Sequence, residues 1–529
     1  MSLLLAVSAV ALASAPMPAA AQHHHMPGMT MPAKPKPKPA VKKKAAPVKK
    51  KVVKKSVAKK APTKPAAKRK AAVRPAAPAA ETPVDHSTMD HGEIAPPTAS
   101  PVPTPPASPP AAAPVDHSQM DHSQMGHSPT GQAMPGGHQG HEQMTGALGS
   151  YPMMREASGS AWQPDNSEHA GVMGSSGDWT LMGHGVLNLV YDHQGGRRGD
   201  DKVFASGMLM GMAKRPLGNG TLQFRAMVSP DPLMGKSGYP LLLASGETAN
   251  GTDRLIDRQH PHDFFMELSA SASQNLGAGN SVFVYAGLPG EPAFGPPAFM
   301  HREAILDSPE APISHHWLDS THISFGVVTG GLVLGRAKLE VSRFNGREPD
   351  EHRWNIETGA LDSTAVRVSW NPTDSLSLQG SWGDFIDPEQ LEPGVDQKRW
   401  SASLLYAREV APGWKLAGTL AWGRKSADGH HDDAFVAEAG LKHRGWTIFG
   451  RGEMTENREL IELEEDEHGP AFKVGKASLG ALRDFRIARN LTLGAGGLVS
   501  LNFVPRGLRQ DYGGSNPMGA MAFVRVKLD

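Results

Sequence analysis

A five-residue pattern, Asp-His-Ser-x-Met, recurs near the beginning of this 529-residue chain, starting at Asp85, Asp116 and Asp121. The soft thioether sulfur of methionine suits Cu(I), whereas imidazole and carboxylate suit Cu(II), so each copy offers ligands for both oxidation states. Zinc or nickel needs only the histidine and the aspartate, and the methionine therefore favours copper. The alternative is a biased segment with no ligand role. The predicted copper ligands are His23, His24, His25, Met26, Met29, Met31, His86, Met89, His91, His117, Met120, His122, Met125, His127, Met134, His138, His141 and Met144.

A second histidine-rich stretch lies further along the chain, where six of the fourteen histidines after residue 150 fall within 63 residues. Such a set suits a divalent metal site, a proton-transfer pair or a plug of hydrogen bonds inside a protein wall. Confining many titratable groups costs free energy unless each is hydrogen-bonded or metal-bound. We expect at least three of these histidines to converge, with Asp263 or Asp319 beside them to orient the imidazoles. The set comprises His260, His262, Asp263, His301, His315, His316, Asp319 and His322.

Enzymatic chemistry receives little support from the sequence. Ser314, His316, Asp319 and Ser320 supply the residue types of a hydrolytic triad, but no Gly-x-Ser-x-Gly motif places a serine as nucleophile. The glycine-rich residues 287–292 lack the Gly/Lys spacing of a phosphate-binding loop. We therefore expect no enzyme and no nucleic-acid partner.

The composition indicates an exported protein. The chain contains no cysteine, which excludes a disulfide framework, cysteine-based zinc sites, iron–sulfur clusters and thiol catalysis. Residues 2–14 are apolar or small, and Ala19, Ala20 and Ala21 precede Gln22, so residues 1–21 are predicted to be a signal peptide. Export without cysteine points to a bacterial envelope.

Residues 22–150 have few valine, isoleucine or leucine side chains and no aromatic ones, so we expect a disordered tail. Eighteen of the 54 lysines and arginines fall between Lys34 and Arg74, which leaves the rest of the chain acidic. This Lys/Pro/Ala tract is either an extended, solvated spacer or a segment that adheres to an anionic envelope polymer or lipid headgroup.

After residue 150 the sequence changes to short segments of alternating polarity separated by Gly, Pro, Asp and Asn, a pattern that predicts strands. Leu339 and Val341, for example, alternate with Lys338, Glu340 and Ser342. The histidine set falls in the long connections between these strands or at their borders. The sixteen predicted strands are residues 178–191, 201–213, 219–229, 263–273, 280–288, 317–329, 333–344, 363–371, 375–384, 398–408, 414–423, 433–443, 446–454, 473–484, 491–501 and 518–528.

The connections between these strands alternate in length. They are short after even-numbered strands, as at Gly330–Gly331, and mostly long after odd-numbered strands, as at residues 230–262 and 289–316. This asymmetry is typical of an outer-membrane barrel with an even strand number. We therefore predict an all-β protein: a 16-stranded antiparallel transmembrane barrel over residues 151–529 with both termini in the periplasm. The histidine set is expected at the long-loop end or in the lumen.

A set of methionines has two interpretations within this barrel. Met208, Met210 and Met212 share one face of a predicted strand, and Met227 and Met234 follow. If that face meets lipid, the methionines are ordinary apolar residues. If it points inward, they form a row of thioethers suited to Cu(I).

The Asp-His-Ser-x-Met repeats of residues 85–127, after a signal peptide and before a barrel, resemble the copper resistance protein B family of Gram-negative outer membranes. The resemblance covers the tail and the architecture and not the barrel sequence. Residues 257–263, 290–302 and 313–322 look like those of an uncharacterised group of envelope proteins. The resemblance implies copper handling, with the tail in the periplasm and lipid and copper ions as partners.

Three functions follow from these observations. The tail sequesters copper with the barrel as its anchor, which is the main hypothesis. The barrel alternatively forms a porin-like channel for metal ions or small solutes. The least favoured hypothesis is an enzyme built on the His/Asp set.

Overall fold

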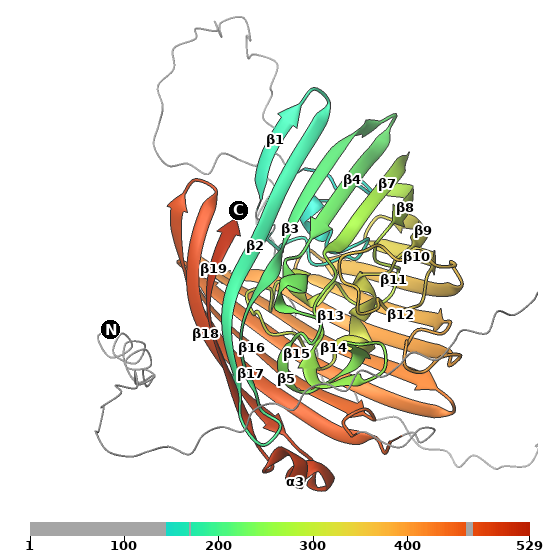
Figure 1. The fold of residues 1–529 in the computed structure, drawn as a ribbon. Coiled ribbons are helices and arrows are strands. Elements are labelled where there is room, and N and C mark those ends of the chain that lie inside the picture. The colour runs from blue at the N-terminus through green and yellow to red at the C-terminus, as the bar shows by residue number, and fades with distance from the viewer. Residues whose placement is uncertain (1–143, 169–170, 462–468) are drawn as a thin grey trace, which may run out of the picture. The chain divides into compact units, whose positions relative to one another are not determined.

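Sixteen antiparallel strands form a closed ring in the computed structural model, which describes residues 144–168, 171–461 and 469–529 (Figure 1). The ring closes where β19 pairs with β2, and every other strand pairs with its neighbours in chain order. The predicted fold class is confirmed. The ring consists of β2 (Trp179–Gln194), β3 (Asp201–Leu217), β4 (Gly220–Val228), β7 (Phe265–Gly277), β8 (Asn280–Gly287), β9 (Val327–Leu334), β10 (Ala337–Phe344), β11 (Ser363–Thr373), β12 (Leu376–Phe385), β13 (Gln397–Ala411), β14 (Trp414–Ala427), β15 (His430–His443), β16 (Trp446–Asn457), β17 (Phe472–Ala488), β18 (Leu491–Phe503) and β19 (Met518–Leu528).

One end of the ring carries only tight turns. Each of the seven connections from β3–β4 to β17–β18 at this end has two residues between the strand bounds. At Arg444–Gly445, for example, both residues have positive φ values, +49° and +78°, as a type I′ turn requires. The opposite end carries the long connections, so the predicted alternation of loop lengths is confirmed.

The two faces of the wall have opposite chemistry. On β10, Leu339 and Val341 are each 46% exposed, whereas Lys338, Glu340 and Ser342 are buried. The same pattern continues around the ring, where exposed aliphatic residues alternate with buried charged ones such as Arg367 on β11. A water-soluble protein buries its aliphatic side chains, so this wall suits a lipid environment outside and a polar interior.

Three segments of the chain fill the interior of the ring. Residues 144–168 contact β7 and β11: the Ser273 hydroxyl donates to Ala147 O at 2.7 Å, and the Asn371 amide donates to Gln163 O at 2.8 Å. Residues 229–264 contain η2 (Asp231–Met234) and the hairpin β5 (Tyr239–Thr248)–β6 (Arg254–Gln259), and Figure 1 shows β5 inside the ring.

The third internal segment, residues 288–326, crosses the lumen from one wall to the other. The Ala293 amide donates to Ser342 on β10 at 2.7 Å, and Asp307 accepts from Arg525 on β19 at 2.5 Å. The segment contains η3 (Phe299–His301), α2 (His315–Leu318) and η4 (Ser320–His322).

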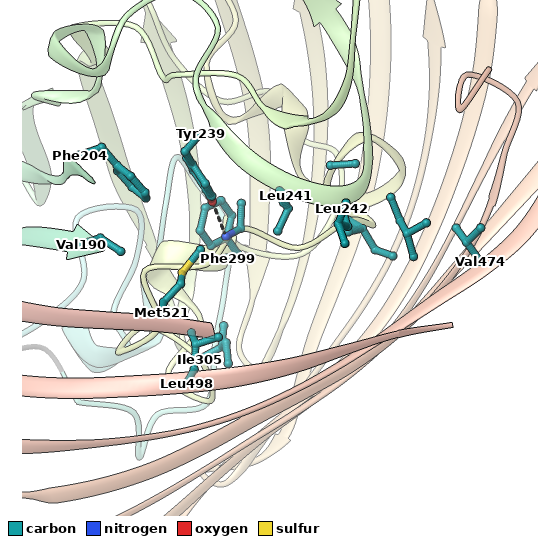
Figure 2. Close-up of a cluster of buried hydrophobic side chains, with 14 of the residues drawn as sticks. Val190, Phe204, Tyr239, Leu241, Leu242, Phe299, Ile305, Val474, Leu498 and Met521 are labelled. Carbon is teal, nitrogen blue, oxygen red and sulfur yellow. Dashed lines mark hydrogen bonds between the residues drawn. The ribbon is translucent and has the colours of Figure 1, made fainter. Parts of the chain in front are cut away.

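An apolar core fixes the internal segments against the wall. Figure 2 shows Leu241 and Leu242 of β5 and Phe299 and Ile305 of the third segment beside wall residues that include Met521 of β19. The Tyr239 hydroxyl accepts a hydrogen bond from the Ala311 amide at 2.9 Å, which joins the second and third segments (Figure 2). The lumen contents are therefore packed as part of the folded protein.

The structure corrects several sequence predictions. The strand expected at 317–329 begins only at Val327, because Trp317, Leu318, Ile323 and Phe325 are buried inside the lumen rather than in the wall. Gly330–Gly331 lies within β9, and the turn is at Gly335–Arg336.

Three strands were not predicted. β5 and β6 are internal, and β1 (Val172–Ser176) pairs with Trp179–Gly183, the part of the β2 edge beyond the last β19 pair at Gly185. β1 thus covers an edge that would otherwise be open. Among the described residues, no helix has the length and apolar character needed to cross a bilayer.

Candidate metal centre in the lumen

Three of the six predicted histidines meet inside the barrel. His262 follows β6 in the second internal segment, and His315 and His322 come from α2 and η4 of the third. All three are buried, and one ring nitrogen from each lies within 4.8 Å of those of the other two. The ring centroids of His262 and His322 are 5.2 Å apart, as are those of His315 and His322.

Each imidazole of this trio is oriented by an oxygen acceptor at Nδ1. Nδ1 of His262 lies 2.8 Å from the Asp231 carboxylate, and Nδ1 of His315 lies 2.9 Å from the Asp319 carboxylate. Nδ1 of His322 lies 2.7 Å from the main-chain oxygen of Asp319. Because a carbonyl oxygen only accepts and these carboxylates favour a donor, Nδ1 carries the proton and Nε2 carries the lone pair.

The Nε2 atoms of His262 and His322 are buried and have no hydrogen-bond partner among the residues that the structure describes. A buried nitrogen lone pair without a partner costs free energy, which a bound cation would recover. Imidazoles whose second nitrogen is fixed by a carboxylate or carbonyl oxygen are the usual ligand arrangement of zinc and copper sites. The trio therefore fits a transition-metal ion held by three nitrogens.

Asp319 connects the trio to the wall. Its carboxylate also accepts from Arg302 at 2.5 Å, and Arg302 binds both oxygens of Glu438 on β15 at 2.8 Å. Burial raises the pKa of Asp319, but Arg302 and His315 outweigh it and hold the pKa below its usual value. Asp319 is therefore ionised and accepts the His315 proton.

Burial also sets the charge of the imidazoles. It lowers the pKa of His315, although Asp319 opposes the shift, and it lowers the pKa of His322 well below the usual value. Both imidazoles are therefore neutral near pH 7, the form that binds a metal.

His260 and His316 form a second pair beside the trio. The ring centroid of His260 lies 6.0 Å from that of His315 and 5.4 Å from that of His316. Nε2 of His260 is 3.0 Å from Glu247, and Nδ1 of His316 is 3.4 Å from Glu348. Each imidazole of this pair thus has a carboxylate partner of its own.

The remaining predicted residues have other positions. Asp263 accepts from Arg353 at 3.2 Å and orients none of the three imidazoles. His301 is half-buried on η3 and does not belong to the trio. Of the predicted copper ligands, Met144 lies among the described residues, and its main-chain oxygen accepts from the Met153 amide at 2.7 Å. The other predicted copper ligands lie outside the described ranges.

Two residues of the site were not predicted from the sequence: Asp231, which orients His262, and Arg302, which binds Asp319. Asp231 is 31 residues from His262, and no regular spacing links the two. A carboxylate at the start of a long loop between two strands was the only available signal.

A further group of carboxylates lies at the long-loop end of the ring. Glu389, Glu392 and Glu459 place oxygens within 4.8 Å of one another around Arg254, which lies 2.6 Å from Glu459 and 3.0 Å from Glu392. They border a polar cavity of about 860 Å³ that Trp317, next to His316, also lines. Arg254 and Lys425 account for the close carboxylates through charge pairing.

Comparison with known proteins yields a fold likeness alone. No protein family matches the chain, and no curated protein does. Similar solved structures include the anion-selective porin of Comamonas acidovorans (12% identity, TM-score 0.38, 66% of this chain and all of the porin). OprB of Pseudomonas putida has 10% identity and a TM-score of 0.45, over 66% of this chain and 94% of OprB. OmpF of Salmonella typhi, in complex with daunomycin, has 10% identity and a TM-score of 0.42, over 68% of this chain and all of OmpF.

Proposed function

We propose that this protein is a porin-like barrel of the outer membrane of a Gram-negative bacterium, and that it binds a transition-metal ion inside its lumen. The closed, even-numbered ring with an apolar outer face supports the location. The observation that carries the metal function is the trio His262, His315 and His322, in which each Nδ1 is held by an oxygen.

The tail extends this proposal to copper tolerance. Its Asp-His-Ser-x-Met repeats bring soft and borderline ligands to the same polypeptide as the trio. We place the tail in the periplasm, where it sequesters copper ions next to the barrel. The lysine-rich residues 34–74 then lie close to anionic lipid or polymer of the envelope.

Metal stoichiometry of the purified full chain tests the metal function. The double variant His262→Gln/His322→Gln removes two of the three nitrogens, and we expect it to bind one Zn(II) fewer per chain than the wild type. The tail contributes equally to both proteins. His193→Gln is the matched control, because His193 is half-exposed and pairs with Asp201 away from the trio. Equal stoichiometry in wild type and double variant, both folded, would contradict the proposal.

Passage of small solutes is the second candidate function. The cavity of about 860 Å³ at the long-loop end favours it, because charged side chains such as Arg254, Lys425 and Glu459 line it. Residues 288–326 cross the lumen from β10 to β19, so we expect passage to require this segment to move. Conductance of the full chain in planar bilayers tests this candidate. Discrete current steps would support a channel. The absence of such steps would contradict this candidate and leave metal binding as the proposed function.

A further inference from the structure

Methionines occupy adjacent inward positions on neighbouring strands of the wall. Met210 on β3 is paired directly with Met227 on β4, and Met182 on β2 is paired directly with Met212 on β3. Side chains at directly paired positions of antiparallel strands have Cβ atoms about 4.5–5.5 Å apart and share one face. The wall therefore brings thioethers from several strands together in register.

Met210 and Met227 belong to a buried cluster with two further methionines, which we call the methionine patch: Met208, Met210, Met227 and Met266. They pack with Ile323 and Phe325 of the third internal segment, and the half-buried Met300 packs against them. The face that carries Met208 and Met210 thus points into the lumen and not toward lipid.

Methionine is concentrated in this cluster compared with the rest of the lumen core. Methionine supplies four of the six buried residues of this cluster but only two of the 22 buried residues in the larger core of Figure 2. Ordering a methionine costs more side-chain entropy than ordering leucine or isoleucine, and its flexibility specifies a core less well. A ligand role for the sulfur atoms would account for methionine at positions where leucine or isoleucine would specify the core better.

We propose that the methionine patch binds a soft monovalent cation, Cu(I), through thioether sulfurs, with Met210 and Met227 as the central ligands. Neutral thioethers bind Cu(I) and discriminate against Zn(II), whose usual ligands are thiolate, imidazole and carboxylate. The patch is separate from the imidazole trio but borders it. Ile323 follows His322, and Met300 follows Phe299, whose ring centroid lies 5.6 Å from that of His315. The lumen then holds a nitrogen site and a sulfur site side by side, and the sulfur site does not depend on the nitrogen site being occupied.

The patch is tested on the full chain labelled with ¹³C at the methionine methyl groups, in detergent and without oxygen. Cu(I), with Ag(I) as a second probe, is added until the tail methionines are saturated. We expect the resonances of Met210 and Met227, assigned by single substitution to leucine, to shift and saturate. Zn(II) should leave them in place. Met454 and Met518 are exposed, at 41% and 59%, and serve as internal controls that do not shift. Unchanged Met210 and Met227 resonances at saturation of the tail would overturn the proposal.

A variant provides an independent measurement. Met210→Leu/Met227→Leu keeps the side-chain volume, so the barrel should fold, as retained compact migration on an unheated gel would show. We expect it to bind one Cu(I) fewer per chain than the wild type and than Met454→Leu, while its Zn(II) stoichiometry is unchanged. An unchanged Cu(I) stoichiometry would overturn the methionine site and leave the imidazole trio untouched. If His262→Gln/His322→Gln instead binds as much Zn(II) per chain as the wild type, the imidazole trio alone is overturned.

Discussion

At the scale of single residues, the trio depends on oxygen atoms that accept a hydrogen bond from Nδ1 of each imidazole and so fix its orientation. Asp319 supplies two of the three acceptors, its carboxylate to His315 and its main-chain oxygen to His322. Histidine clustering predicted the imidazoles because six of them fall in a short stretch of sequence. Asp231 was not predictable, because the fold alone brings it 2.8 Å from His262.

The first prediction concerns Asp319→Asn. The amide keeps the shape of the side chain but removes the charge that supports the His315 proton and pairs with Arg302. We expect the affinity of the trio for Zn(II) to fall by about 10- to 100-fold, the usual loss when a partner of a ligating histidine is removed. Competition with a chelator of known affinity measures it. Asp263→Asn is the control, because Asp263 pairs with Arg353 and with none of the three imidazoles. A similar loss in both variants would show that general destabilisation, and not orientation of His315, is responsible.

At the scale of elements, the period-2 pattern predicted the wall well because every wall strand has one face in lipid and one in the lumen. The prediction failed at residues 317–326, where Trp317, Leu318, Ile323 and Phe325 are buried within the lumen core. A run of apolar residues signals burial but not the layer in which burial occurs. The hairpin β5–β6 was missed for the same reason, since Leu241, Leu242 and Leu243 form a continuous apolar run.

The second prediction concerns the bond between the third internal segment and the wall. Arg302 is fully buried and joins Asp319 of that segment to Glu438 of β15. Arg302→Met keeps much of the volume but leaves the buried Asp319 carboxylate without its cationic partner. Breaking a buried ion pair in this way costs about 3–5 kcal/mol of unfolding free energy.

Denaturant unfolding of the folded protein in detergent measures this loss. Arg424→Met is the matched control, because the Arg424–Asp433 pair on β14 and β15 is partly exposed, at 39% and 21%. Partly exposed pairs contribute about 0–1 kcal/mol. Equal losses in the two variants would mean that Arg302 does not fasten the segment to the wall.

At the scale of the whole molecule, one polypeptide carries two kinds of proposed metal site: the repeats of the tail, and the trio and methionine patch inside the barrel. The repeats of residues 85–127 lie before the barrel in the chain, and the trio lies inside the barrel. The strand number and the closed antiparallel ring were predictable from loop lengths and alternation, because an outer-membrane wall imposes both. Its filled interior was not, because contacts such as Ala293 with Ser342 and Asp307 with Arg525 join residues of the third segment to distant strands.

The last prediction separates the two kinds of site in cells. Deleting residues 22–143 removes the Asp-His-Ser-x-Met repeats and keeps both the predicted signal peptide and residues 144–168, whose hydrogen bonds to β7 and β11 belong to the folded barrel. If the tail sequesters copper, growth in the presence of copper salts should fall toward that of cells without the protein, at equal amounts of barrel in the outer membrane. Reversing the order of each repeat, from Asp-His-Ser-x-Met to Met-x-Ser-His-Asp, keeps composition and charge. This control should retain copper tolerance if tolerance depends on the number of Asp, His and Met ligands in the tail and not on their order in the sequence. Retained tolerance in the deletion strain would contradict the tail hypothesis and assign tolerance to the barrel, and in that case His262→Gln/His322→Gln should abolish it.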